Sequence, residues 1–167
     1  VSVVSNSEIL SSPYINAEDI VRSIPGVYNF RHSGLHTNGI VSPIDMRGAG
    51  KNRVLILVDG VPQNDNFNNA VAWVAWGHIP KDGIERIEIV RGPSSSLYGS
   101  EGLGGVINII TRKPGKDRYT SLQARAGNAS TFGGNGFYSQ KFENFSFLLT
   151  GAYEKSDGFY ICLLYTS

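Results

Sequence analysis

The longest apolar stretches of this chain are only as long as β-strands, and this feature most constrains its fold. They cover residues 54–58 and 70–76, whereas a helix that crosses a membrane needs about 20 consecutive apolar residues. The 20 glycines among 167 residues supply turns between such short segments. We therefore expect a fold of short strands and many turns, without a spanning helix. Strands of a membrane barrel need only about 10 residues of alternating pattern, so this test does not exclude them.

Charge and cysteine content point to no macromolecular partner. The 15 basic and 14 acidic residues give a formal net charge of +1, so no broad attraction for nucleic acid is expected. The single cysteine, Cys162, forms neither an internal disulfide nor a structural zinc cluster. No grouping of serine, histidine and acid, and no pair of carboxylates in a pocket pattern, indicates catalysis. The sequence therefore predicts a non-enzyme without a resident cofactor or metal.

Residues 1–114 alternate short strands with short helices. Ser5 and the two residues after it can cap a helical turn at 8–11, and Asn16 with Asp19 marks the start of a second helix. Pro25 then stops that helix. Strands are expected at 1–5, 53–58, 84–91 and 106–111, with a tight turn at Asp59-Gly60. This pattern predicts an α+β fold in which short helices cover a mixed sheet.

Two irregular segments, 28–42 and 63–78, interrupt this pattern and are candidate ligand-binding loops. Their amides donate and accept hydrogen bonds, and their aromatic rings offer stacking surface, which together suit a polar chelate or a sugar-like ligand. The alternative for Trp73 and Trp76 is packing in the core or against a surrounding wall. The candidate ligand-binding residues are Tyr28, Asn29, Arg31, His32, Asn64, Asp65, Asn66, Phe67, Asn68, Trp73 and Trp76.

Alternating side chains characterise the chain after residue 114. Extended segments are expected at 120–126, 132–142 and 145–154, and the last of them places aromatic residues on one face. Strands of a membrane barrel alternate in this way, and an ordinary antiparallel sheet on a soluble core predicts the same pattern. The alternation alone leaves both possibilities open.

Several blocks of sequence, in order, closely resemble the plug domain of TonB-dependent receptors. They are IPGV at 24–27, MRG at 46–48, RVLILVDGVP at 53–62, IERIEIVRGPSSSLYG at 84–99 and GGVINIITR at 104–112. The resemblance covers about residues 1–114. It implies a plug domain with a mixed β-sheet and short helices over 1–114, and the first strands of an incomplete antiparallel transmembrane β-barrel over 115–160. The tail, 161–167, is expected to be truncated or non-native.

The resemblance also implies a receptor and transporter of the cell outer membrane. In this family a scarce small-molecule ligand, such as a ferric siderophore or another metal chelate, haem or cobalamin, binds at the outer face, and the plug gates the barrel. TonB, an energy-transducing partner, delivers the energy. Its contact segment is expected upstream of Val1. The alternative is a soluble ligand-binding or adaptor domain of plug-like fold without transport.

Charged residues on or beside the predicted strands are candidates for the interface between plug and barrel. A plug that is held yet movable needs hydrated charges at its boundary rather than dry packing. Exposed ion pairs contribute only about 0–1 kcal/mol, which suits weak coupling. The alternative is that these side chains are solvated. The candidates are Arg47, Arg86, Glu88, Arg91 and Arg112.

Overall fold

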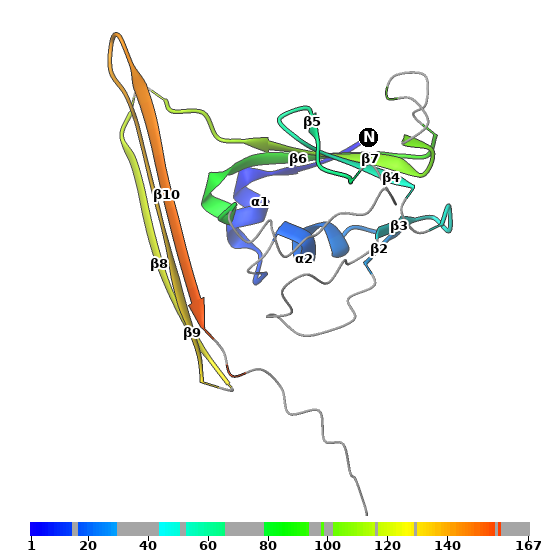
Figure 1. The fold of residues 1–167 in the computed structure, drawn as a ribbon, viewed down its shortest axis with the longest axis horizontal. Coiled ribbons are helices and arrows are strands. Elements are labelled where there is room, and N and C mark those ends of the chain that lie inside the picture. The colour runs from blue at the N-terminus through cyan, green and yellow to red at the C-terminus, as the bar shows by residue number, and fades with distance from the viewer. Residues whose placement is uncertain are drawn as a thin grey trace, which may run out of the picture.

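The computed structural model describes residues 1–14, 17–29, 44–50, 53–65, 79–93, 98, 102–115, 117–128, 130–155 and 157 (Figure 1). These residues form a 5-stranded sheet in the order β1-β6-β7-β4-β5, a 3-stranded sheet in the order β10-β9-β8, and a 2-stranded sheet of β2 and β3. The elements are β1 (Ser2–Ser5), α1 (Asn6–Ser11), α2 (Ala17–Arg22), β2 (Val27–Asn29), β3 (Ile44–Met46), β4 (Val54–Val58), β5 (Val61–Pro62), η2 (Lys81–Gly83), β6 (Ile84–Arg91), β7 (Gly105–Thr111), β8 (Tyr119–Gly127), β9 (Thr131–Lys141) and β10 (Ser146–Lys155).

The 5-stranded sheet is mixed, as predicted. Strand β4 runs parallel to β7, with Leu55 opposite Val106, whereas β1, β5 and β6 pair in antiparallel fashion with their neighbours. Most of β4 is buried, which is typical of an apolar strand inside a sheet. The sheet and its short helices form the globular part of the molecule, in agreement with the predicted α+β class.

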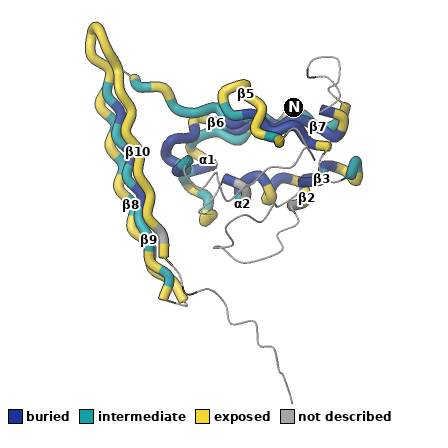
Figure 2. Tube along the Cα trace, viewed as in Figure 1, coloured by how far each residue is buried: buried dark blue, intermediate teal, exposed yellow. Residues whose placement is uncertain are grey.

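The main core lies between the 5-stranded sheet and the helices (Figure 2). Ile87 of β6 and Ile107 of β7 are fully buried, as is Ile9 of α1, and Val21 of α2 belongs to the same cluster. Alternation along β6 places Glu88 on the opposite face of the sheet, as predicted. Burial of an apolar side chain of this size contributes about 1.5–3 kcal/mol, so this layer supplies much of the stability of the globular part.

Helix α1 begins earlier than predicted, at Asn6 rather than residue 8, because Ser5 is its N-cap. The backbone amide of Ser5 donates to Glu8 Oε2 (2.7 Å), and the amide of Glu8 donates to Ser5 Oγ (3.5 Å), which completes a capping box. Hydrogen bonds from Ser5 lower the pKa of the Glu8 carboxyl. The predicted cap of α2, Asn16, lies outside the described residues. None of the described helices is long and apolar enough to cross a membrane.

The predicted loop at 28–42 is wrong at its beginning. Tyr28 and Asn29 belong to β2, where Tyr28 pairs with Asp45 of β3. The stretch lacks the alternation that marks a strand in sequence, and pairing with a distant segment decides its conformation. Residues 30–42 of the same predicted loop lie outside the described residues, as do residues 66–78 of the second.

The predicted turn after β4 is confirmed. Asp59 and Gly60 have φ angles of 50° and 82°, as a tight hairpin turn into β5 requires. The Asp59 carboxylate also accepts hydrogen bonds from the amide (2.8 Å) and the hydroxyl (2.6 Å) of Thr111. The turn is therefore tied to the end of β7.

Strands β8, β9 and β10 form a long antiparallel meander beside the end of the sheet where β6 begins (Figure 1). On one face, Ser121 pairs with Phe137 and Gln123 with Asn135. These positions are buried or half-buried, while Leu122 and Ala124 on the other face are exposed. The alternation predicted for 120–126 is confirmed. In β9 three glycines obscure the same alternation in the sequence.

Candidate functional site

The meander meets the globular part at the short turn η2, which we call the η2 corner (Lys81–Gly83). Asp82 is only 2% exposed, and its Oδ2 accepts a hydrogen bond from Nδ2 of Asn135 in β9 (3.2 Å). Beside it, the ring of Phe137 lies against Gly83, where an added Cβ would be 3.3 Å from Phe137 Cε2. The absence of a side chain at Gly83 thus permits close approach.

A second hydrogen bond extends this contact into β8. Arg125 Nη1 donates to Asn135 Oδ1 (2.9 Å), so the amide of Asn135 is bonded at both ends. The result is a chain from the Asp82 carboxylate, through a 5%-exposed amide, to the Arg125 guanidinium. We call the contact between the globular part and the meander the seam. Because a carboxylate lies at one end of this chain of hydrogen bonds and a guanidinium at the other, the charges on the two sides of the seam are complementary.

The η2 corner is also bonded within the globular part. Lys81 Nζ donates to the carbonyl oxygens of Leu10 (3.4 Å) and Ser12 (3.2 Å), at the C-terminal end of α1. A cation there complements the helix dipole. The amide of Arg112 donates to the Gly83 carbonyl (2.7 Å), which joins the corner to the end of β7. Helix, sheet and meander therefore meet at one turn.

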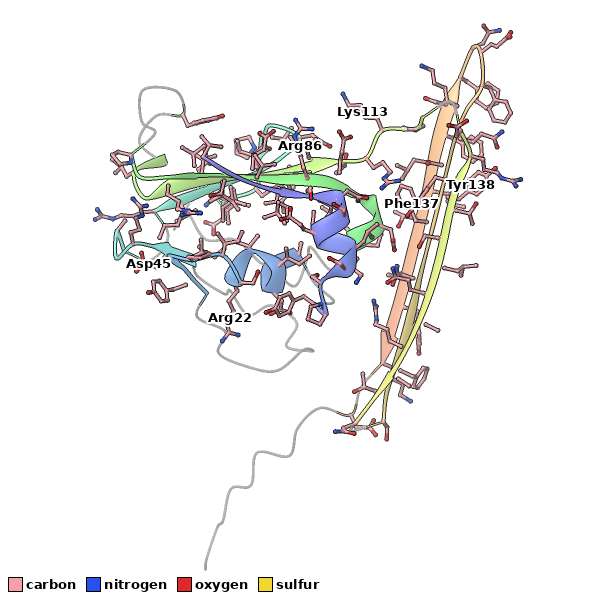
Figure 3. The ribbon with its side chains drawn as sticks, turned by 180° about the vertical axis from the view of Figure 1, so that it is seen from behind. Arg22, Asp45, Arg86, Lys113, Phe137 and Tyr138 are labelled. Carbon is pink, nitrogen blue, oxygen red and sulfur yellow. The ribbon has the colours of Figure 1, made fainter. Side chains whose placement is uncertain are left out.

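Arg112, one of the predicted interface residues, lies where the globular part meets the meander, and its role as a contact with a barrel stays a prediction. Its guanidinium carbon is 4.2 Å from the ring centroid of Tyr119 in β8, and its Nη2 donates to Asn6 Oδ1 (2.6 Å). The Tyr119 ring in turn meets Phe137 edge to face, with centroids 5.8 Å apart. Figure 3 shows Phe137 on the side of the meander toward the globular part and Tyr138 on the other. An open cavity of about 370 Å³ adjoins the seam, lined by Glu85, Arg112, Lys113, Gly115, Asp117, Arg118, Tyr119 and Ser139.

The other predicted interface residues lie elsewhere on the globular part. Arg86 forms ion pairs with Glu88 (2.7 Å) and Glu85 (3.2 Å) on the sheet face opposite the helices. Arg91, at the other end of β6, donates to Ser2 Oγ. Arg47 is exposed after β3 and has a φ of 53°. Their role as contacts with a barrel stays a prediction.

The predicted ligand-binding residues are only partly described. Tyr28 is 61% exposed on β2, which also contains the backbone of Asn29. Asn64 bonds to the edge of β4: its Nδ2 donates to the Val54 carbonyl (2.9 Å), and its Oδ1 accepts from the Ile56 amide (2.8 Å). Asp65 has interaction partners in the structure. The remaining candidates, Arg31, His32, Asn66, Phe67, Asn68, Trp73 and Trp76, lie outside the described residues.

The outward face of the meander exposes apolar and aromatic side chains. Leu122 is 85% exposed and Leu149 67% exposed. Aromatic contacts lie toward both ends of the strands: Phe132 meets Tyr153 (centroids 6.0 Å apart), and Tyr138 stacks on Phe147 (5.5 Å). An apolar band between aromatic groups, opposite a polar face, is the arrangement of strands in an outer-membrane barrel.

Several seam residues were not predicted from the sequence. Asp82 sits in a Lys-Asp-Gly turn whose composition is typical of exposed turns, yet it is 2% exposed. Asn135 and Phe137 are two residues apart in β9 and face the same way, but glycines hide this spacing. Two-residue spacing within β9 is the signal by which they could have been found. Within the described ranges, no three His, Cys, Asp or Glu side chains gather as metal ligands do.

Comparison with known proteins assigns the family. The model of the TonB-dependent receptor plug domain matches residues 1–106. The chain is 32% identical over 159 residues to the vitamin B12 transporter BtuB of Vibrio vulnificus, covering 95% of this chain and 25% of that protein. It is 34% identical over 177 residues to the ferric enterobactin receptor of Pseudomonas aeruginosa, covering 94% and 23%. The chain thus spans about a quarter of the length of these relatives.

Solved structures extend the similarity into the meander. The siderophore receptor PirA from Acinetobacter baumannii has a TM-score of 0.69 and 29% identity, with 93% of this chain and 24% of that chain covered. PirA from Pseudomonas aeruginosa has a TM-score of 0.65 and 32% identity, with 93% and 27% covered. The fold of a plug followed by strands of an unclosed barrel is thus confirmed.

The names of the relatives agree with the predicted location and class. They are receptors and transporters, and an iron-regulated outer membrane virulence protein of Vibrio cholerae is 42% identical over 117 residues, or 68% of this chain and 17% of that protein. The outer-membrane location predicted from the resemblance is confirmed. Because the family model matches more than half of the residues of this chain, the chain belongs to the TonB-dependent receptor plug domain family.

Proposed function

We propose that this chain is the plug (1–114) and the first barrel strands (115–160) of an outer-membrane receptor that takes up a scarce ligand. The plug gates the barrel, TonB delivers the energy, and the protein performs no catalysis. The observation that carries this proposal is the two-sided meander. Its outward face is exposed and apolar, while its inward face bonds through Asn135 to the buried Asp82 of the plug.

The two faces of the meander suit two different environments. A soluble adaptor domain has no reason to present a band of exposed aliphatic residues between aromatic groups, because such a surface causes aggregation in water. In a lipid bilayer the same band is solvated by acyl chains. The inward face carries Arg125 and Asn135, and Asn135 bonds to the plug at Asp82. This distribution favours the receptor over the soluble alternative.

The ligand class follows from the relatives and from the loops of the plug. The relatives include a vitamin B12 transporter and ferric enterobactin receptors. We infer a metal chelate of this kind, bound at the segment between β2 and β3 and the segment between β5 and η2. Tyr28 offers an exposed phenol on β2, beside the first segment, and the sequence of the second segment supplies the rings of Trp73 and Trp76.

Uptake by the full-length receptor tests the proposal. The receptor is produced in cells that lack their own siderophore, haem and cobalamin receptors, and the accumulation of ferric enterobactin, haem and cobalamin is followed with and without TonB. We expect at least one of the three to accumulate only when TonB is present. Accumulation of none of them, or accumulation that is independent of TonB, would contradict the proposal.

The ligand residues are tested by binding rather than by uptake. Trp73→Ala and Trp76→Ala should weaken the equilibrium affinity for the transported probe, because loss of an aromatic stacking partner costs about 0.5–1.5 kcal/mol beyond the buried area. Asn128→Ala, at an exposed position between β8 and β9, is the control and should leave the affinity unchanged. An unchanged affinity in both tryptophan variants removes these residues from the site.

A further inference from the structure

We propose that the η2 corner is the fixed attachment of the plug to the barrel wall, and that it stays closed during uptake while other parts of the plug rearrange. This inference rests on the proposed function, because it concerns a plug that must move. The hydrogen bond from Asn135 to Asp82 and the ring of Phe137 on Gly83 lie at the corner itself. The stack of Arg112 on Tyr119 lies beside it.

The barrel side of this attachment is built to resist opening. Both ends of the Asn135 amide are bonded, and the Asp82 carboxylate that it contacts is 2% exposed. Separation of the two parts before water enters would leave a buried carboxylate without this donor, which is far more costly than loss of an exposed hydrogen bond. The Arg86–Glu88 pair, with side chains 39% and 32% exposed, lacks this protection.

The plug side of the attachment is equally well bonded. Lys81 ties the corner to the end of α1, and the Gly83 carbonyl ties it to the end of β7. Asn6 Nδ2 also donates to the Ile84 carbonyl directly after the corner (2.6 Å). The corner is therefore continuous with the rigid layer of α1, β6 and β7, so the layer and the barrel wall form one unit.

The elements that lead to the predicted ligand loop lie away from this attachment. Strands β2 and β3 form a separate 2-stranded sheet at the end of the globular part that is remote from the meander (Figure 1). Each strand has 3 residues. Val27, Ile44 and Met46 pack this sheet into the main core, but only three residue pairs join its two strands. The arrangement places a fixed corner at one end of the plug, and at the other a small sheet that flanks the predicted ligand segment.

A covalent tether across the seam tests the proposal. Glu85 and Ser139 line the same cavity beside the η2 corner, so Glu85→Cys with Ser139→Cys can be bridged by a cleavable bifunctional thiol reagent. The pair is placed in the full-length receptor with Cys162→Ser, and the hydrogen bond between Asn135 and Asp82 stays intact. Uptake of whichever probe the wild-type receptor accumulates is measured before bridging, after bridging and after cleavage. The two single-cysteine variants, treated alike, control for alkylation.

We expect the bridged receptor to take up the probe at the rate of the unbridged receptor. Uptake that stops on bridging and returns on cleavage would overturn the proposal, because the plug would then have to leave the wall at this corner. A second pair, Asp82→Cys with Asn135→Cys, repeats the measurement at the position of the Asn135–Asp82 hydrogen bond if the first pair fails to assemble. Absence of TonB-dependent uptake in the wild-type receptor would contradict the proposed function instead, so the two failures are distinguishable.

Discussion

Replacement of Asn135 by alanine should loosen the plug more than any exposed substitution in the meander. The change removes the donor to Asp82 and the acceptor of Arg125 at once. Loss of a hydrogen bond to a buried charged group costs about 1.5–3 kcal/mol. Because Asp82 is 2% exposed, water does not readily replace the donor, and we expect a loss of about 2–3 kcal/mol in the free energy of plug unfolding.

Pulse proteolysis over a urea series measures this loss in the purified full-length receptor. Asn128→Ala, in the exposed turn between β8 and β9, is the matched control and should stay within about 0.5 kcal/mol of wild type. Asp82→Asn keeps an acceptor for Asn135 and should cost less than Asn135→Ala. A double-mutant cycle with Asp82→Ala should give a coupling energy of about 0.5–3 kcal/mol. An Asn135→Ala variant as stable as the Asn128→Ala control would refute the reasoning.

Three further substitutions test other parts of the structure. Gly105→Ala should prevent folding of the plug or lower its free energy of unfolding by more than about 3 kcal/mol, because φ is 144° and a Cβ would lie 2.6 Å from both a methionine sulfur and a carbonyl oxygen. Pulse proteolysis measures this loss. The control, Gly115→Ala, has open space around the added Cβ and should be neutral. Glu8 has a lowered pKa, so its contribution to stability is present above the unfolded pKa and is lost as pH falls through the folded pKa. In urea titrations at a series of pH values, the Glu8→Gln variant should lack this loss of stability on acidification. A variant with the same pH profile of stability as the wild type would contradict this role of Glu8. Leu122→Arg, at an 85%-exposed outward position, should destabilise barrel assembly by about 2–4 kcal/mol, whereas the inward-facing Gln123→Lys should be tolerated. Assembly yields of the two variants in lipid vesicles measure the difference. Equal yields would contradict the assignment of Leu122 to the lipid-facing side and Gln123 to the inner side.

Local sequence patterns predicted much of the fold. The apolar run of β4, the alternation of β6 and the turn at Asp59-Gly60 are each decided by residues near one another in sequence. The pattern failed at β2, because the partner of Tyr28 lies on β3 and no local feature indicates that pairing. The order of strands in the sheet likewise depends on distant contacts.

Of the residues named from the sequence as interface candidates, Arg112 is the one that contacts the meander among the described residues. The sequence prediction selected charged residues on or beside the strands of the globular part. The contact with the meander instead depends on Asp82, Asn135 and Phe137. The composition of the turn at 81–83 predicts an exposed Asp82, yet the residue is 2% exposed and bonds to Asn135 of the meander. Its burial comes from segments that are distant in sequence.

Oxygen accessibility along β8 in the full-length receptor, reconstituted in lipid, tests the central claim most directly. Spin labels are placed one at a time at positions 120–126, and their collisions with dissolved oxygen are compared with those of a water-soluble nickel complex. A plug docked inside a membrane barrel predicts high oxygen contact at Leu122 and Ala124 and low contact at Ser121 and Gln123, with a period of two. Equal accessibility of all positions to the nickel complex would show a strand in water and would contradict the assignment of this chain to an outer-membrane receptor.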